Sequence, residues 1–292
     1  LIGILPWQKN TVPVPYQSAL FLLLLAPEFY APLRQLGADY HVKAQAEGAI
    51  AELSPLLAFQ SAENTKANPS ILTAPPAIDA DNIWVNHQQR TRLAPLSFAI
   101  AAGERLAIVG QSGSGKSTLL QIFLGFCAYQ GDIFIDNQNF NTINSTQFRH
   151  QIAYLSQQTM LLPMSIADNL RLPNPTASDD KLWQILAQVG LKPLIKALPN
   201  QLDTQLGERG SGLSGGQQRR LAIAQLLLQE AHLWLLDEPT EHLDSDTAAE
   251  INGLLQQVTR GKTVLWVTHD ATSLPWLDRQ ISLDIASTLA KA

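Results

Sequence analysis

The feature that most restricts the fold of this chain is a glycine-rich loop between an apolar strand and an apolar helix. The run Leu106–Val109 has the length and the side chains of a buried strand. A helical apolar pattern is predicted from Thr118. The loop between them reads Gly110-Gln111-Ser112-Gly113-Ser114-Gly115-Lys116-Ser117. Strand, loop and helix in this order form a P-loop, which predicts an α/β domain with a buried sheet.

The P-loop predicts a site for ATP. Its glycines let backbone N–H groups curl around phosphate oxygens. Lys116 is placed to neutralise the β- and γ-phosphates, and Ser117 is placed to bind Mg²⁺. A glycine-rich turn without a ligand is the alternative, and the flanking strand and helix argue against it. The residues expected to bind the nucleotide are Gly110, Gln111, Ser112, Gly113, Ser114, Gly115, Lys116, Ser117 and Thr118.

Two acidic residues end a second apolar strand. The run Leu233–Leu236 is followed directly by Asp237 and Glu238. Asp237 would hold the Mg²⁺ shell. Glu238 would orient and deprotonate the attacking water. Most adjacent carboxylates are simply solvated, but their place at the end of a buried strand downstream of a P-loop favours a catalytic role.

A third segment, Leu213-Ser214-Gly215-Gly216-Gln217, separates one family from other P-loop ATPases. It resembles the signature of ATP-binding-cassette proteins. The resemblance implies a cassette domain of the P-loop NTPase class, with a mixed sheet and a helical subdomain. It also implies that Ser214 and the backbone at Gly216 open a helix whose N-terminus meets a γ-phosphate. In that family the phosphate is bound to the P-loop of a partner domain.

Three further segments match the family in order. Gln157, after the apolar run Ile152–Leu155, resembles the glutamine that touches Mg²⁺ and senses the membrane domain. The segment 241–244, Glu-His-Leu-Asp, resembles the D-loop. His269, after the apolar run Val264–Val267, resembles the switch histidine on the γ-phosphate. A lone Gln or His is more often structural, but the shared order and the strand-end positions favour these roles.

The residue that stacks on adenine is less defined. The family usually places an aromatic residue on an early strand before the P-loop. Spacing favours His87, whereas Trp84 offers the larger ring, and either side chain can instead serve only in packing.

The front of the chain predicts a long helix. The 17 residues from Thr11 to Pro27 carry no charge, which suits a short membrane span, with a buried soluble helix as the alternative. An apolar stripe at steps of three and four extends the helix from about Gln17 to Ser54, where Pro55 is expected to end it. We expect residues 1–60 to form the last transmembrane helix and its extension, 61–77 a linker and 78–292 the cassette.

Two segments favour an exporter. Residues 204–210, which include Glu208, resemble the exporter X-loop. Residues 26–41 resemble the last transmembrane helix of the CydD family. That resemblance implies a thiol exporter (glutathione, cysteine) needed for cytochrome bd assembly and located in the bacterial inner membrane, with the cassette on the cytoplasmic side. The implied partner is a second, CydC-like half-transporter that forms a dimer with composite ATP sites. An importer ATPase and a soluble cassette protein remain alternatives.

Composition and the termini add three expectations. The formal net charge is −5 and no basic stripe is visible, so nucleic acid is not an expected partner. The single cysteine, Cys127, excludes an internal disulfide and is expected to be a small buried residue in a helical apolar pattern. Because the chain begins at Leu1 and five transmembrane helices of a half-transporter are largely missing, we expect it to be incomplete at the N-terminus.

Overall fold

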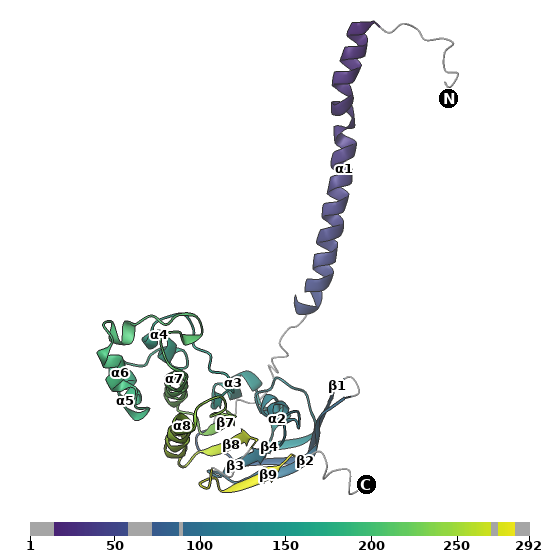
Figure 1. Cartoon of the computed structure of the whole chain (residues 1–292). Helices are drawn as coiled ribbons and strands as arrows, with labels where there is room; N and C mark the ends of the chain where they lie inside the picture. Colours follow the sequence, from purple (N-terminus) through teal and green to yellow (C-terminus); the bar gives the residue numbers. More distant parts are fainter. Residues whose placement is uncertain (1–14, 58–71, 88–89, 270–273, 284–292) are drawn as a thin grey trace, which may run out of the picture. The chain divides into compact units, whose positions relative to one another are not determined.

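The chain divides into two compact units, Leu1–Ala62 and Glu63–Ala292. The computed structural model describes residues 15–57, 72–87, 90–269 and 274–283 (Figure 1). The first unit therefore consists of one described helix, and the second of two sheets with their helices.

The first unit is the helix α1, Tyr16–Leu57, of 42 residues, or about 63 Å at about 1.5 Å per residue. It runs three residues beyond the predicted end at Ser54. Pro55 lies in the last turn, where proline removes one hydrogen bond but has a helical φ. Within its own unit the helix leaves large apolar side chains exposed, among them Phe21 and Leu23. By length and composition, Tyr16–Ile50 is long and apolar enough to cross a membrane.

The second unit contains a parallel and an antiparallel sheet (Figure 1). The parallel sheet has the order β6-β7-β8-β3-β9, with bounds Ile152–Leu155, Leu233–Asp237, Thr263–Thr268, Arg105–Val109 and Arg279–Ser282. The antiparallel sheet has the order β2-β1-β4-β5, with bounds Arg90–Ile100, Ile78–His87, Gln130–Ile135 and Gln138–Asn139. The predicted mixed α/β class is confirmed.

Helices cover both faces of the parallel sheet. Its strands alternate between two apolar clusters: Leu233 and Leu235 face one, and Trp234 and Leu236 face the other. Strands buried on both faces need this continuous apolar sequence. The helices are α2 (Lys116–Phe123), α3 (Ser145–Arg149), α4 (Ile166–Arg171), α5 (Asp179–Gln188), α6 (Lys192–Ala197), α7 (Gly215–Leu228) and α8 (Ser245–Val258), with short 3₁₀ turns η1 (Phe140–Thr142), η2 (Gln201–Asp203) and η3 (Glu208–Gly210).

The two clusters serve different parts of this unit. In one cluster α2 contacts β2 of the antiparallel sheet and β7 and β8 of the parallel sheet, and so joins the two sheets. In the other, α7 contacts both α4 and α5 and packs against β6, which attaches the helical subdomain to the sheet. The predicted helical subdomain is thus built around the helix that follows the signature segment.

Helix α2 ends earlier than the apolar pattern suggested. Gly125 adopts φ 70°, and its N–H donates to Ile122 O at 2.8 Å, while Phe126 N–H donates to Gln121 O at 2.9 Å. This pair of bonds is a Schellman motif, which closes a helix at a left-handed glycine. Cys127 therefore lies outside the helix, and its side chain is half-buried rather than fully buried.

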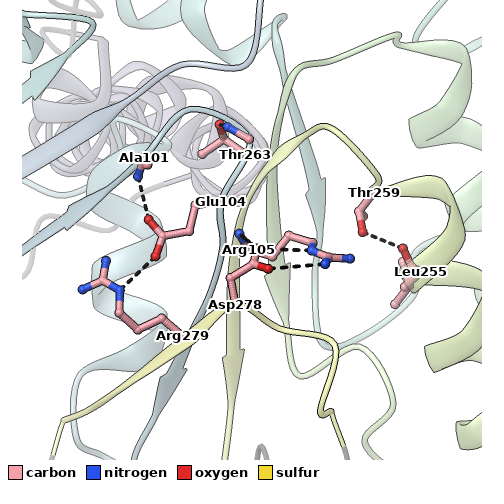
Figure 2. Close-up of polar contacts among 9 residues, drawn as sticks. Ala101, Glu104, Arg105, Leu255, Thr259, Thr263, Asp278 and Arg279 are labelled. Carbon is pink, nitrogen blue, oxygen red and sulfur yellow. Dashed lines mark hydrogen bonds and ion pairs between the residues drawn. The ribbon is translucent and has the colours of Figure 1, made fainter.

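Polar contacts hold the edge strand β9 against β3 (Figure 2). The Arg279 guanidinium donates to Glu104 Oε1 at 2.8 Å, and the Glu104 carboxylate also accepts from Ala101 N–H at 2.6 Å. Asp278 accepts from the backbone N–H of Arg105 at 2.8 Å and pairs with its guanidinium at 3.4 Å. These contacts set the register of β9 beside the strand that leads into the P-loop.

A buried threonine at the start of β8 connects the segment before β1 to the parallel sheet. Thr263 is fully buried; its hydroxyl accepts from Gly103 N–H at 2.9 Å and donates to Pro76 O at 2.7 Å. Thr259, also fully buried, donates its hydroxyl to Leu255 O at 2.7 Å, but Leu255 O already accepts from Thr259 N–H at 3.0 Å (Figure 2). Without the Thr259 hydroxyl, Leu255 O would keep its backbone hydrogen bond. Without the Thr263 hydroxyl, Gly103 N–H and Pro76 O would lose the hydrogen bonds described above.

We expect Thr263→Val to lower the free energy of unfolding by about 1–3 kcal/mol, because the buried carbonyl of Pro76 and the half-buried N–H of Gly103 lose their bonds. Thr259→Val is the matched control and should cost less than about 1 kcal/mol. The measurement is the urea midpoint of the full chain in detergent, followed by tryptophan fluorescence, at an unchanged slope. Equal midpoints for the two variants would contradict this account.

Candidate nucleotide site

A cavity of about 640 Å³ opens where strands of the parallel sheet end. Because β7, β8 and β3 are parallel neighbours, the segments that follow them meet at one edge of the sheet. Ligands of open α/β sheets bind at this edge. The cavity is lined by Thr91, Arg92, Ser112, Gly113, Gly115, Lys116, Ser117, Thr118, Gln157, Asp237, Glu238, Glu241 and His269. The structure thus brings together most residues that the sequence placed at the site.

The P-loop backbone can be built only with glycine at one position. Gly115 adopts φ 99° immediately before α2, and a Cβ there would lie 2.5 Å from Arg92 O. Gly113 adopts φ 83° with open space around it. Ser114 is buried, its hydroxyl has no hydrogen-bond partner in the described part of the chain, and, like Gly110 and Gln111, it is not among the residues that line the cavity.

Lys116 is held in place by the loop that it serves. It is 7% exposed, and its Nζ donates to Gly110 O at 2.7 Å and to Gln111 O at 3.0 Å. Its Nζ also lies 3.4 Å from Glu238 Oε1. A buried ammonium held by carbonyl and carboxylate oxygens is well placed to bind phosphate.

The residues predicted to bind Mg²⁺ have a suitable set of donor atoms. Asp237 is buried at the end of β7, and burial raises the pKa of its carboxyl, opposed by the Ser117 hydrogen bond and by the charge of Lys116. Gln157 lines the same cavity. Hydroxyl, carboxylate and amide oxygens are ligands that Mg²⁺ prefers. Ser117, Asp237 and Gln157 therefore fit the ion, with phosphate and water oxygens needed to complete its shell.

Glu238 combines strain with an altered acidity. It is a non-glycine residue at φ 43°, and its N–H donates to Val267 O at 2.9 Å, so the adjacent strand holds this conformation. Burial and the neighbouring Glu241 raise the pKa of its carboxyl, and Lys116 opposes this. His269 Nδ1 lies 3.9 Å from Glu238 Oε2. A carboxylate with a raised pKa beside the phosphate loop suits a general base.

Arg219 is a residue of the site that was not predicted from the sequence. This side chain of α7 is buried and donates to Pro239 O and to Ser156 O, each at 2.6 Å. Burial lowers its pKa to about 10. One guanidinium thereby fixes the backbone beside Gln157 and the backbone that follows Glu238. The available signal was a cation inside an apolar helix, because a buried charge requires partners.

The signature segment does not reach the cavity of its own chain. Ser214 caps α7: its Oγ accepts from Gln217 N–H at 3.3 Å, and Gln217 Oε1 accepts from Ser214 N–H at 2.9 Å. A Cβ at Gly216 would lie 2.6 Å from Thr247 Cγ2. Neither Ser214 nor Gly216 lines the cavity beside Lys116. The helix N-terminus is formed as expected, and it can meet a phosphate only if that phosphate comes from elsewhere.

The adenine-stacking residue and the X-loop-like segment stay predictions. The side chain of His87 lies outside the described residues, and the half-buried Trp84 is not among the residues that line the cavity. Thr91 and Arg92 of β2 do line it. Glu208 is exposed and begins the turn η3.

The chain is similar in sequence to known transport proteins. Residues 93–241 match the family model described as "ABC transporter". The chain is 34% identical over 275 residues to "Glutathione/L-cysteine transport system ATP-binding/permease protein CydD" of Escherichia coli, covering 94% of this chain and 47% of that protein. It is 41% identical over 198 residues to the CydC protein of the same transport system in E. coli, covering 68% of this chain and 34% of that protein.

A solved structure is similar over nearly the whole chain. It is titled "Structure of a bacterial Atm1-family ABC exporter with ATP bound", with a TM-score of 0.73 and 29% identity, covering 91% of this chain and 47% of that one. The chain spans about half the length of the curated relatives that it matches first.

Proposed function

The chain belongs to the ABC transporter family, and on that premise we propose that it is the ATPase-bearing part of one half of a membrane exporter. The observation that carries the proposal is the cavity at the sheet edge. There Lys116 and the P-loop face Asp237 and Glu238. A phosphate-binding loop and two carboxylates on one cavity suit hydrolysis of a nucleoside triphosphate.

The proposed chemistry assigns one task to each group. Loop N–H groups and Lys116 bind the phosphates and neutralise their charge. Glu238 orients the attacking water and accepts its proton. His269 contacts the γ-phosphate from the end of β8. A bound Mg²⁺, held by Ser117, Asp237 and Gln157, would stabilise negative charge on the phosphate oxygens.

The exporter assignment is supported by α1 together with the cassette. The similar Atm1-family exporter covers 91% of this chain, a share larger than the second unit alone. Within its own unit α1 exposes apolar side chains on consecutive positions, from Leu20 to Leu25, so they surround the helix. A helix that is apolar on all sides needs lipid or a protein core around it. We assign it to the inner membrane, with the cassette in the cytoplasm.

The partner is a second half-transporter. The chain resembles both CydD and CydC of E. coli, two proteins whose names assign them to one transport system. Because Ser214 lies away from the cavity of its own chain, its phosphate would be the one on the partner's P-loop. Two chains facing each other would then form composite ATP sites, each with one P-loop and one signature helix.

The names of two relatives support a thiol substrate. CydD and CydC carry the names of a glutathione and L-cysteine transport system. We propose that the assembled transporter exports such thiols. An ATP-driven change between inward-open and outward-open states would couple hydrolysis to export.

Glu238→Gln should retain ATP binding and lower the turnover of the assembled transporter by about 10²-fold or more, because the amide cannot accept the proton. Glu250→Gln, at an exposed carboxylate on α8, is the control and should retain turnover. Phosphate release and nucleotide binding are measured on the same preparations. Near wild-type turnover in Glu238→Gln would refute the assignment of the base.

Ser214→Arg should leave ATP binding by this chain intact and reduce hydrolysis by the pair, because charge and bulk would meet the partner's nucleotide. The substitution also removes a helix cap worth about 1 kcal/mol. Ser214→Asn retains a cap and therefore controls for the stability of α7. Equal loss of nucleotide binding in the isolated Ser214→Arg chain would argue against a shared site.

The cargo is tested with the complete pair in membranes. ATP-dependent accumulation of labelled glutathione or cysteine in inverted vesicles is expected, and Lys116→Ala should abolish it. Cargo should also change the rate of ATP hydrolysis, because a coupled transporter binds cargo differently in its two states. A pair that hydrolyses ATP but neither responds to thiols nor moves them would refute the substrate and leave the ATPase intact.

A further inference from the structure

We propose that Glu241 is a positioning residue for Gln157. Its carboxylate takes the nitrogen end of the Gln157 amide and leaves the oxygen end free to bind Mg²⁺. The inference rests on the proposed function, since it concerns how the ATPase site is prepared for its metal ion. Glu241 belongs to the D-loop-like segment, for which the sequence analysis assigned no such task.

The contact joins two segments that are distant in the sequence. Gln157 follows β6 and Glu241 follows β7, the neighbouring strand in the sheet. Gln157 Nε2 donates a hydrogen bond to Glu241 Oε2. Both side chains line the cavity that contains Lys116 and Asp237. The side-chain amide of Gln157 is therefore held by Glu241 within the cavity where the predicted Mg²⁺ ligands lie.

The chemistry of the two groups determines which end of the amide is used. A glutamine amide has one accepting oxygen and one donating NH₂ group, whereas an ionised carboxylate only accepts. The end that faces Glu241 must therefore be the nitrogen. Mg²⁺ takes oxygen ligands, so only the opposite end of Gln157 is useful to it. The hydrogen bond selects the productive orientation before the ion arrives.

The remaining neighbours of Glu241 do not replace this role. Glu238 also contacts Glu241: burial and a hydrogen bond between the two carboxyl groups raise the pKa of Glu238, whereas the Gln157 hydrogen bond and the same carboxyl contact lower the pKa of Glu241, which favours the ionised, accepting form of Glu241. Lys116 Nζ lies 3.4 Å from Glu238 Oε1. His242 Nδ1 lies 3.8 Å from Glu241 Oε2, and its side chain is 80% exposed, against 28% for Glu241. His242 is thus a suitable control: it adjoins the contact, lies in the same loop and is not part of the cavity lining.

The test compares metal affinity with nucleotide bound. The full chain in detergent is saturated with a non-hydrolysable ATP analogue, and Mn²⁺ binding is followed by electron paramagnetic resonance. We expect Glu241→Ala to weaken Mn²⁺ binding by about tenfold, the scale for losing a group that orients a metal ligand. Glu241→Gln should restore wild-type affinity, because its amide oxygen can still accept. His242→Ala should bind Mn²⁺ as the wild type does.

A double-mutant cycle distinguishes positioning from direct ligation. If Glu241 acts through Gln157, Gln157→Ala should lose as much affinity as Glu241→Ala, and the double variant should lose no more.

Three results would overturn the inference: unchanged Mn²⁺ affinity in Glu241→Ala, an equal loss in Glu241→Gln, or additive losses in the double variant. The last two would mean that the carboxylate acts on the ion by its own charge. The proposed function is tested separately, by comparing nucleotide-dependent Mn²⁺ binding of the wild type with that of Lys116→Ala. Wild-type chain without nucleotide-dependent Mn²⁺ binding would refute both claims, whereas intact wild-type binding with unaffected Glu241 variants would refute only the positioning role.

Discussion

Parallel pairing of β7, β8 and β3 is the constraint on which the site depends. Parallel neighbours end at the same edge, so the loops after Val109, Asp237 and Thr268 meet although they come from distant parts of the sequence. Both faces of these strands are buried, so polar groups concentrate at their ends. The sheet thus supplies a rigid base for a cavity whose walls are loops.

Charge balance is the second feature of the site. Lys116 is buried, pairs with Glu238 and lines one cavity with Asp237 and Glu241. Burial raises the pKa values of Asp237 and Glu238, because an apolar surrounding disfavours their charged forms. Such a group of charges suits a site that receives both anionic phosphates and a divalent cation. Arg219 of α7 donates hydrogen bonds to the backbone at Ser156 and at Pro239, and so holds two of the loops at this site.

Single segments of the sequence were sufficient for most of the fold and much of the site. The apolar run 152–155 has the same bounds as the strand β6. The bounds of three other predicted strands, which precede the P-loop, the two acids and His269, agree with β3, β7 and β8 to within about one residue. Local patterns carry this information because a buried strand, a glycine loop and a capped helix each depend on near neighbours. The predicted end of α2 was wrong, because Gly125 adopts a left-handed conformation that ends the helix although the apolar pattern continues.

The sequence by itself determined which residues can bind phosphate, hold a metal ion and activate water, because these abilities belong to residue types and their spacing. Only the tertiary structure decided which of them share a cavity. It placed Gln157 against Glu241 and buried Arg219 between two loops, whereas Ser214 lies away from Lys116. These relations depend on strand order and on the packing of α7, and contacts between segments some 60 to 80 residues apart have no local signature in the sequence.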